Sequence, residues 1–122
     1  MKIENVILQK SADFAVRIVN LYKYISATYK DKVIVTQLLR SGTSIGANAE
    51  EADAGISKKD FLSKMYISLK EARETKFWLV LLHRTQYIND TEFESIYSDC
   101  IELIKLLSAI TKTTKENLHN PN

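Results

Sequence analysis

The scarcity of proline and glycine constrains this sequence more than any other feature. Its single proline, Pro121, is the last residue but one of 122, so no proline interrupts a helix in the rest of the chain. Only three glycines occur, too few for the turns of a many-stranded sheet. We therefore predict an all-α fold.

The bulk properties indicate one ordinary globular unit. A chain of 122 residues can bury one core but hardly two, and 45% hydrophobic with 26% charged residues is a normal globular mixture. We expect a single four-helix domain over residues 1–122. No apolar run approaches the roughly 18 residues of a membrane span, and the first residues lack the apolar core of a signal peptide. We therefore expect a cytoplasmic protein with no membrane partner.

Apolar residues recur at three- and four-residue spacing in four segments, which we interpret as helices over roughly residues 11–30, 36–54, 58–86 and 91–116. The predicted inward-facing residues are Phe14, Ile18, Leu21 and Ile25; Leu38, Ser41, Ile45, Ala49 and Ala52; Phe61, Met65, Leu69, Ala72 and Leu79; and Phe93, Tyr97, Cys100, Ile104, Leu107 and Thr111. Ser57 with Asp60, and Thr91 with Glu94, have capping-box spacing where the third and fourth segments begin. Short links between long helices favour an antiparallel up-down-up-down four-helix bundle.

Patterns typical of catalysis and metal binding are missing from the sequence. Cys100 is the only cysteine, so neither an internal disulfide nor a cysteine-based metal cluster can form within the chain. A di-iron bundle needs two Glu-x-x-His pairs, and the only match is Glu116 with His119. His83 has no acidic residue three or four positions away, and phosphate-binding and dinucleotide motifs are absent. We therefore expect a non-catalytic protein without a cofactor or metal.

A line of polar residues runs along one edge of the apolar stripe of the second segment. It comprises Arg40, Ser44, Asn48 and Glu51. Arg40 and Glu51 would be about 16 Å apart along a helix axis, too far to pair with each other. One interpretation is a hydrogen-bonded network that fixes helix register or a subunit contact, because buried polar groups need partners. The other is a ligand-facing groove, helped by the small residues Gly42 and Gly46.

Basic and aromatic residues share one stripe of the third segment. At about 100° per residue, four cations fall within about 60° of one another, with two aromatic rings among them. They are Lys59, Lys70, Arg73, Arg84, Tyr66 and Phe77. This combination suits a nucleic-acid groove, where cations contact phosphates and aromatic faces stack on bases. The alternative is a solvated face on which Glu71 and Glu74 pair with the neighbouring cations.

Basic and acidic residues are concentrated in different segments of the chain. Residues 57–86 hold seven basic and three acidic residues, whereas residues 90–116 hold three basic and six acidic ones. The bundle should therefore have a basic and an acidic side.

Three further apolar residues, Ile67, Trp78 and Leu82, lie well away from the main stripe of the third segment. They predict a second apolar surface, which a subunit interface would explain, since tryptophan is a common interface anchor. A wide core-facing arc would accommodate Trp78 equally well. We expect a homo-oligomer, with Trp78 either at the interface or in the core.

Three segments resemble a known bacterial family. They are residues 40–52 (RSGTSIGANAEEA), 57–65 (SKKDFLSKM) and 69–79 (LKEARETKFWL), and the likeness is specific from about residue 33 to residue 82. The family comprises four-helix-bundle proteins encoded by intervening sequences inside large-subunit ribosomal RNA genes. The resemblance implies a left-handed bundle, assembly into homopentamers and no catalytic residue. A related group, the accessory proteins of diversity-generating retroelements, resembles the family in fold and assembly and binds nucleic acid and a reverse transcriptase.

Two hypotheses about function follow. The leading one is a homo-oligomeric bundle that binds RNA or DNA, mainly through phosphates, with the basic and aromatic stripe of residues 58–86. The competing one is a protein-interaction scaffold with no nucleic-acid role.

Overall fold

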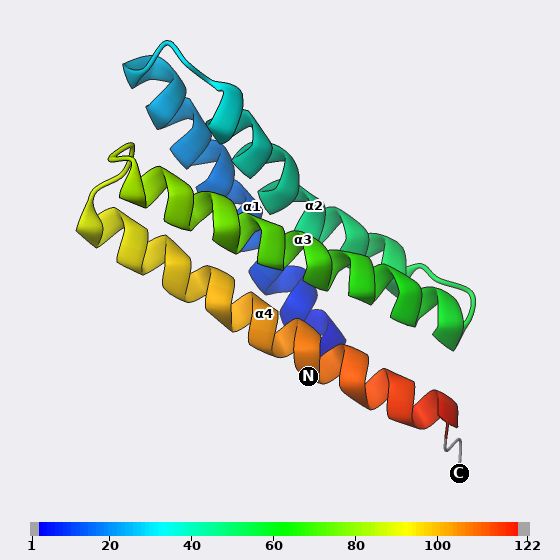
Figure 1. Ribbon diagram of the computed structural model, residues 1–122. Helices are drawn as coiled ribbons and strands as arrows, with labels where there is room; N and C mark the ends of the chain where they lie inside the picture. The colour runs from blue at the N-terminus through cyan, green and yellow to red at the C-terminus, as the bar shows by residue number, and fades with distance from the viewer. Residues whose placement is uncertain (1–2, 120–122) are drawn as a thin grey trace.

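The computed structural model describes residues 3–119, and this part of the chain consists of four helices and no strand (Figure 1). The helices are α1 (Ile3–Thr28), α2 (Val33–Asp53), α3 (Lys58–Arg84) and α4 (Asp90–His119). The all-α prediction is confirmed. No described helix is long and apolar enough to cross a membrane.

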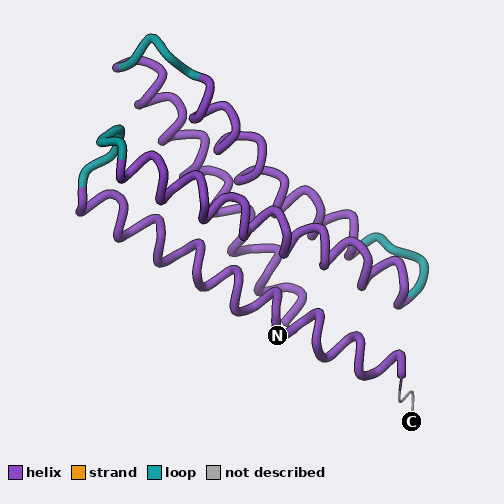
Figure 2. Tube along the Cα trace, in the orientation of Figure 1, coloured by secondary structure: helices purple, strands orange, loops and turns teal. Residues whose placement is uncertain are grey.

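The four helices pack in a ring, each against the helices before and after it, with α4 closing on α1. The contact between α2 and α3 is the most extensive and that between α1 and α4 the least. Ser41 meets Thr75 and Ile45 meets Ser68, so residue numbers rise along α2 as they fall along α3. Figure 2 shows the α1–α2 and α3–α4 connections at one end and the α2–α3 connection at the other. Neighbouring helices therefore run in opposite directions, while the handedness of the twist stays a prediction.

The first helix begins earlier than predicted, at Ile3 rather than near residue 11. Ile7 and Ser11 are completely buried and continue the apolar stripe towards the N-terminus at the same three- and four-residue steps as Phe14 and Ile18. Ser11 concealed this continuation, because a serine inside a stripe resembles the end of a helix. Its hydroxyl donates to the carbonyl of Leu8, which makes its burial tolerable.

The core consists largely of the predicted inward-facing residues. All the stripe residues predicted on α1 and α2 are buried, as are Met65, Ala72 and Leu79 on α3. Phe61, Leu69, Phe93 and Ile104 are half-buried and pack against this core. Tyr97 is half-buried at its margin, where its ring lies 5.0 Å from that of Phe93.

One of the two predicted helix caps is wrong. Ser57 caps α3 as predicted, because its Oγ accepts the Asp60 backbone N–H at 3.1 Å. Thr91 does not cap α4, which begins at Asp90. There the Oδ1 atom of Asn89 accepts the Glu92 N–H at 2.8 Å. Asparagine caps at least as well as threonine, so the chain enters the helix two residues sooner than the Thr91 and Glu94 spacing predicted.

The glycines of α2 let α1 approach closely. A Cβ atom at Gly46 would lie 3.3 Å from the backbone oxygen of Ser11, and one at Gly42 would lie 2.8 Å from Cγ1 of Ile18. Both glycines are buried. The space beside these two glycines is therefore filled by α1, by its backbone at Gly46 and by a side chain at Gly42, so this face of α2 is not open to a ligand.

Candidate nucleic-acid interface

The basic and aromatic stripe predicted on α3 lies on the outside of the bundle. Its six residues, Lys59, Tyr66, Lys70, Arg73, Phe77 and Arg84, are all exposed. Large aromatic rings are usually covered, yet Tyr66 is 42% and Phe77 58% exposed. We call these six residues the α3 outer face.

The cations of the α3 outer face are free of ion pairs within the described residues. The pairs formed there are Lys10 with Glu102, Arg17 with Asp99, Arg40 with Glu71 and Glu74, Lys64 with Glu51, and His83 with Asp90. Lys59, Lys70, Arg73 and Arg84 are in none of them. A cation without a carboxylate partner keeps its positive field available for a phosphate.

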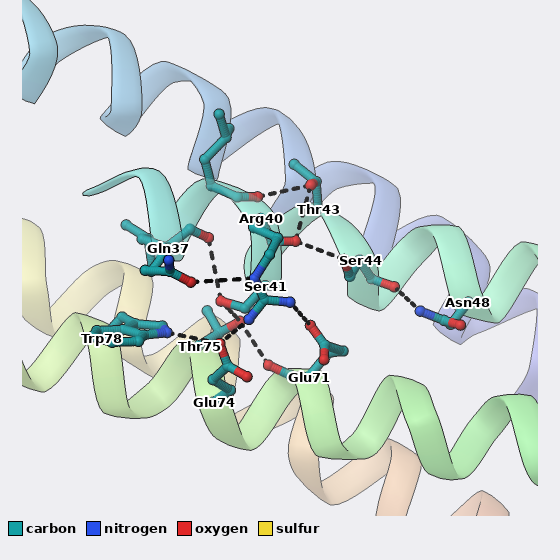
Figure 3. A network of polar contacts seen from close by, with 12 residues as sticks. Gln37, Arg40, Ser41, Thr43, Ser44, Asn48, Glu71, Glu74, Thr75 and Trp78 are labelled. Carbon is teal, nitrogen blue, oxygen red and sulfur yellow. Dashed lines mark hydrogen bonds and ion pairs between the residues drawn. The ribbon is translucent and has the colours of Figure 1, made fainter. Parts of the chain in front are cut away.

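Two acidic residues of α3, Glu71 and Glu74, bond to a residue of another helix (Figure 3). Arg40 of α2 donates from Nη1 to Glu71 Oε2 at 3.0 Å and from Nη2 to Glu74 Oε2. Trp78 Nε1 also donates to Glu74 Oε2, at 3.0 Å. Glu71 and Glu74 therefore form no ion pair with Lys70 or Arg73. The solvated-face interpretation had expected such pairs with the neighbouring cations.

These contacts keep the Glu74 carboxylate ionised and hydrogen-bonded to Arg40 and Trp78. The hydrogen bond from Trp78 lowers the pKa of Glu74, the bond and charge of Arg40 add to that effect, and the charge of Lys70 lowers it further although Lys70 forms no ion pair with Glu74. The same bond to Glu74 raises the pKa of Arg40. Both partners stay ionised at neutral pH, and the pair links α2 to α3.

The polar line on α2 forms a connection between helices. Arg40 pairs with Glu71 and Glu74 at one end, and at the other Glu51 accepts from Lys64 Nζ at 2.9 Å. Between them, Ser44 Oγ donates to the Arg40 carbonyl at 2.7 Å and Asn48 Nδ2 to the Ser44 carbonyl at 2.8 Å. These contacts fit the interpretation as a register-fixing network, because both charged ends have partners on α3.

Buried hydroxyls add an inner polar layer that the sequence interpretation missed on α3. Thr75 Oγ1 bonds to Ser41 Oγ at 3.0 Å, and Ser68 Oγ donates to the Ile45 carbonyl at 2.8 Å. Ser68 and Thr75 are fully buried and alternate with Met65, Ala72 and Leu79 at three- and four-residue steps. Their three- and four-residue spacing was the signal from which the sequence could have predicted these buried hydroxyls. Small hydroxyls at these positions bring α2 and α3 together and position the outer face.

The residues predicted for a subunit interface divide among three environments. Leu82 is 0% exposed and belongs to the core of the single chain, so its assignment to an outer surface is wrong. Trp78 is half-buried against the core and is also bound to Glu74. Ile67 is 36% exposed and so stays available for a subunit interface. Leu82 was misplaced because the inward-facing arc of α3 is wider than the predicted stripe.

The remaining reactive side chains have structural surroundings. Cys100 is buried, its Sγ lies 3.4 Å from the Ala72 carbonyl oxygen, and burial raises the pKa of its thiol to about 12. His83 has an acidic partner that its own helix lacks, because Nε2 lies 2.7 Å from Asp90 Oδ1 across the α3–α4 turn. Glu116 and His119 are both exposed on α4. The described residues contain no group of three or more His, Cys, Asp or Glu placed to hold a metal ion.

Four helices in an antiparallel ring define this chain as a four-helix-bundle protein. We call the polar contacts between α2 and α3, from the Arg40 ion pairs to the Ser41–Thr75 hydrogen bond, the α2–α3 seam. The chain belongs to the 23S rRNA-intervening sequence protein family, whose model matches residues 4–109. The match extends well beyond residues 33–82, where the sequence resemblance is specific.

A solved structure supports the same assignment. It is the 1.70 Å crystal structure of a protein of unknown function from the S23 ribosomal protein family of Bacteroides thetaiotaomicron VPI-5482. The two sequences are 52% identical over 91% of this chain and 99% of that chain, with a TM-score of 0.88. A comparison with curated proteins gave no match.

Proposed function

We propose that this protein is a non-catalytic, homo-oligomeric bundle that binds RNA or DNA through the α3 outer face. One observation carries the proposal: four exposed cations without ion-pair partners among the described residues share a face with two exposed aromatic rings. Cations bind phosphates by releasing counterions, and aromatic faces stack on bases without sequence preference. The expected ligand is therefore a polynucleotide held mainly through its backbone.

The α2–α3 seam explains how such a face could form beside acidic residues. Glu74 lies four residues after Lys70, so without Arg40 its carboxylate would be freer to pair with Lys70 at helical spacing. With Arg40 present, the carboxylates of Glu71 and Glu74 both have partners on the α2 side. Self-association, for which we expect a pentamer, would repeat the face around the assembly and strengthen its field.

The first prediction concerns charge reversal on this face. Purified protein is titrated into labelled structured RNA and duplex DNA over a series of salt concentrations. Wild-type affinity should fall steeply with salt, and the double variant Lys70→Glu/Arg73→Glu should lose binding. Each phosphate contact that is removed lowers the slope of log affinity against log salt by about one.

The matched control is Lys105→Glu/Lys112→Glu on α4. These lysines are also exposed and in no ion pair of the described residues, so the net charge changes equally. The control should bind almost as wild type does. Equal loss in both variants would mean that net charge, rather than the α3 outer face, governs binding.

A protein-interaction scaffold gives a different result. No binding to RNA or DNA at low salt, together with a lysate partner retained after nuclease treatment, would reject the nucleic-acid proposal. Phe77→Ala tests the aromatic part of the face within the nucleic-acid proposal. It should weaken binding to single-stranded RNA and leave binding to duplex DNA unchanged, since base stacking contributes about 1–3 kcal/mol per base on single strands and nothing on intact duplex.

A further inference from the structure

A hollow of about 440 Å³ lies at one end of the bundle, where the end of α1 meets the turn between α3 and α4. It is separate from the α3 outer face, because Lys59, Lys70, Arg73 and Arg84 are not in its lining. Its size is within the range of small-ligand sites, about 300–1,000 Å³.

Three tyrosines form the aromatic part of the hollow. Tyr29 and Tyr87 contact each other with ring centroids 4.6 Å apart, and the Tyr29 hydroxyl donates to the Gln86 carbonyl at 3.4 Å. These contacts hold the two rings in place. Tyr24 is 57% exposed and forms no ring pair among the described residues, so its aromatic face is open to a ligand.

The polar part of the hollow is acidic. Asp90 and Glu92 line it together with His83, which is paired with Asp90, whereas no lysine or arginine does. Asp90 uses Oδ1 to bind His83 and leaves its side chain 89% exposed. The Oε1 atom of Glu92 is buried and has no hydrogen-bond partner within the described residues. A buried acceptor without a partner carries a desolvation cost, which a donor relieves only where it can reach the atom.

Helix ends reinforce this preference for positive charge. The C-terminal ends of α1 and α3 both reach the hollow and bring the partial negative charge of their helix dipoles. The N-terminus of α4 carries the opposite partial charge, but Asp90 and Glu92 lie in its first turn and offset it.

We propose that this hollow binds a guanidinium group, carried either by a free small molecule or by an arginine side chain of another protein. A guanidinium presents five N–H donors and no acceptor, pairs with carboxylates in a bidentate manner and stacks on aromatic faces. The hollow supplies the complementary groups, which are two carboxylates and an open tyrosine face. A phosphate would be repelled by both carboxylates and would find no lysine or arginine in the lining.

The test is an NMR titration of the isotope-labelled full-length protein. The probe is N-acetyl-L-argininamide, and its neutral isostere N-acetyl-L-citrullinamide is the control. The side-chain amides of Gln86 and Asn89, which line the hollow, report binding without disturbing it. The arginine compound should shift these signals and bind at least about tenfold more tightly than the citrulline compound, as expected of a charge-assisted hydrogen bond. Equal binding of the two compounds would overturn the proposal.

Substitutions then locate the site. Asp90→Asn/Glu92→Gln removes both charges at constant shape and should weaken the arginine compound at least about tenfold. Tyr24→Leu should weaken it less, because it removes one aromatic face from an exposed position. Glu94→Gln alters an exposed carboxylate of α4 outside the hollow and should leave binding unchanged. Unchanged affinity in both hollow variants would place the ligand elsewhere and reject the assignment.

A third compound distinguishes the two sources of guanidinium. A blocked pentapeptide with a central arginine and glycine elsewhere should bind at least as tightly as the free compound if the natural ligand is a protein segment. Binding of the free compound alone would identify a small molecule, since the flanking backbone would then be excluded. Absence of binding by both would overturn the proposal.

Discussion

Gly42 illustrates how one missing side chain sets a helix contact. A Cβ at this position would lie 2.8 Å from Cγ1 and 2.9 Å from Cγ2 of Ile18, and Ile18 is completely buried. We predict that Gly42→Ala lowers the free energy of unfolding by about 1 kcal/mol. Alanine gains about 1 kcal/mol in helix propensity, but overpacking a core costs about 1–3 kcal/mol. Urea denaturation followed by circular dichroism measures the difference.

Two further variants make the cause of the Gly42 effect testable at the same scale. Ala47→Gly, at an exposed position of α2, should cost about 1 kcal/mol and so measures the propensity gain alone. In an Ile18→Ala background the clash is absent, so Gly42→Ala should become stabilising. A substitution that destabilises equally in both backgrounds would show that contact with Ile18 is not the cause.

At the scale of the element, the end of α3 carries backbone strain. Gln86 has a φ of 70°, and its N–H donates to the His83 carbonyl while the Tyr87 N–H donates to that of Leu82. This is a Schellman motif, whose left-handed position favours glycine. We predict that Gln86→Gly stabilises the bundle by about 1 kcal/mol, because a left-handed conformation costs other residues about that much. Thermal denaturation measures it, with Gln86→Ala as a control that keeps the strain. A glycine variant no more stable than the alanine variant would contradict the prediction.

The elements also show what sequence periodicity could and could not predict. The stripes of α1 and α2 were predictable because apolar residues at three- and four-residue steps cover one face. The start of α1 was missed because Ser11 is buried in the stripe, and the cap of α4 because Asn89 and Thr91 are both good caps. The basic face of α3 was predictable from rotation alone. The partners of Glu71 and Glu74 were not, because they lie on another helix and depend on how α2 and α3 align.

At the scale of the whole molecule, the fold and the proposed binding face are coupled through Arg40. We predict that Arg40→Gln weakens RNA binding although Arg40 is not in the α3 outer face. The substitution leaves Glu71 and Glu74 without their cationic partner. Glu74 can then pair with Lys70 four residues earlier, and both uncompensated carboxylates reduce the positive field of that face. The cost in stability should be only about 1 kcal/mol, because the Arg40 side chain is 48% exposed and exposed ion pairs contribute little.

The measurement is the same salt-dependent titration, with Arg17→Gln as the matched control. Arg17 is also a partly exposed arginine that bonds across helices, to Asp99 and Ser95 of α4. Its loss changes the net charge equally and breaks one interhelical ion pair, against two for Arg40. Arg40→Gln should bind more weakly than Arg17→Gln, and removing both acids in Arg40→Gln/Glu71→Gln/Glu74→Gln should restore affinity. If the triple variant binds no better than the single one, the α2–α3 seam stabilises the bundle without tuning its basic face.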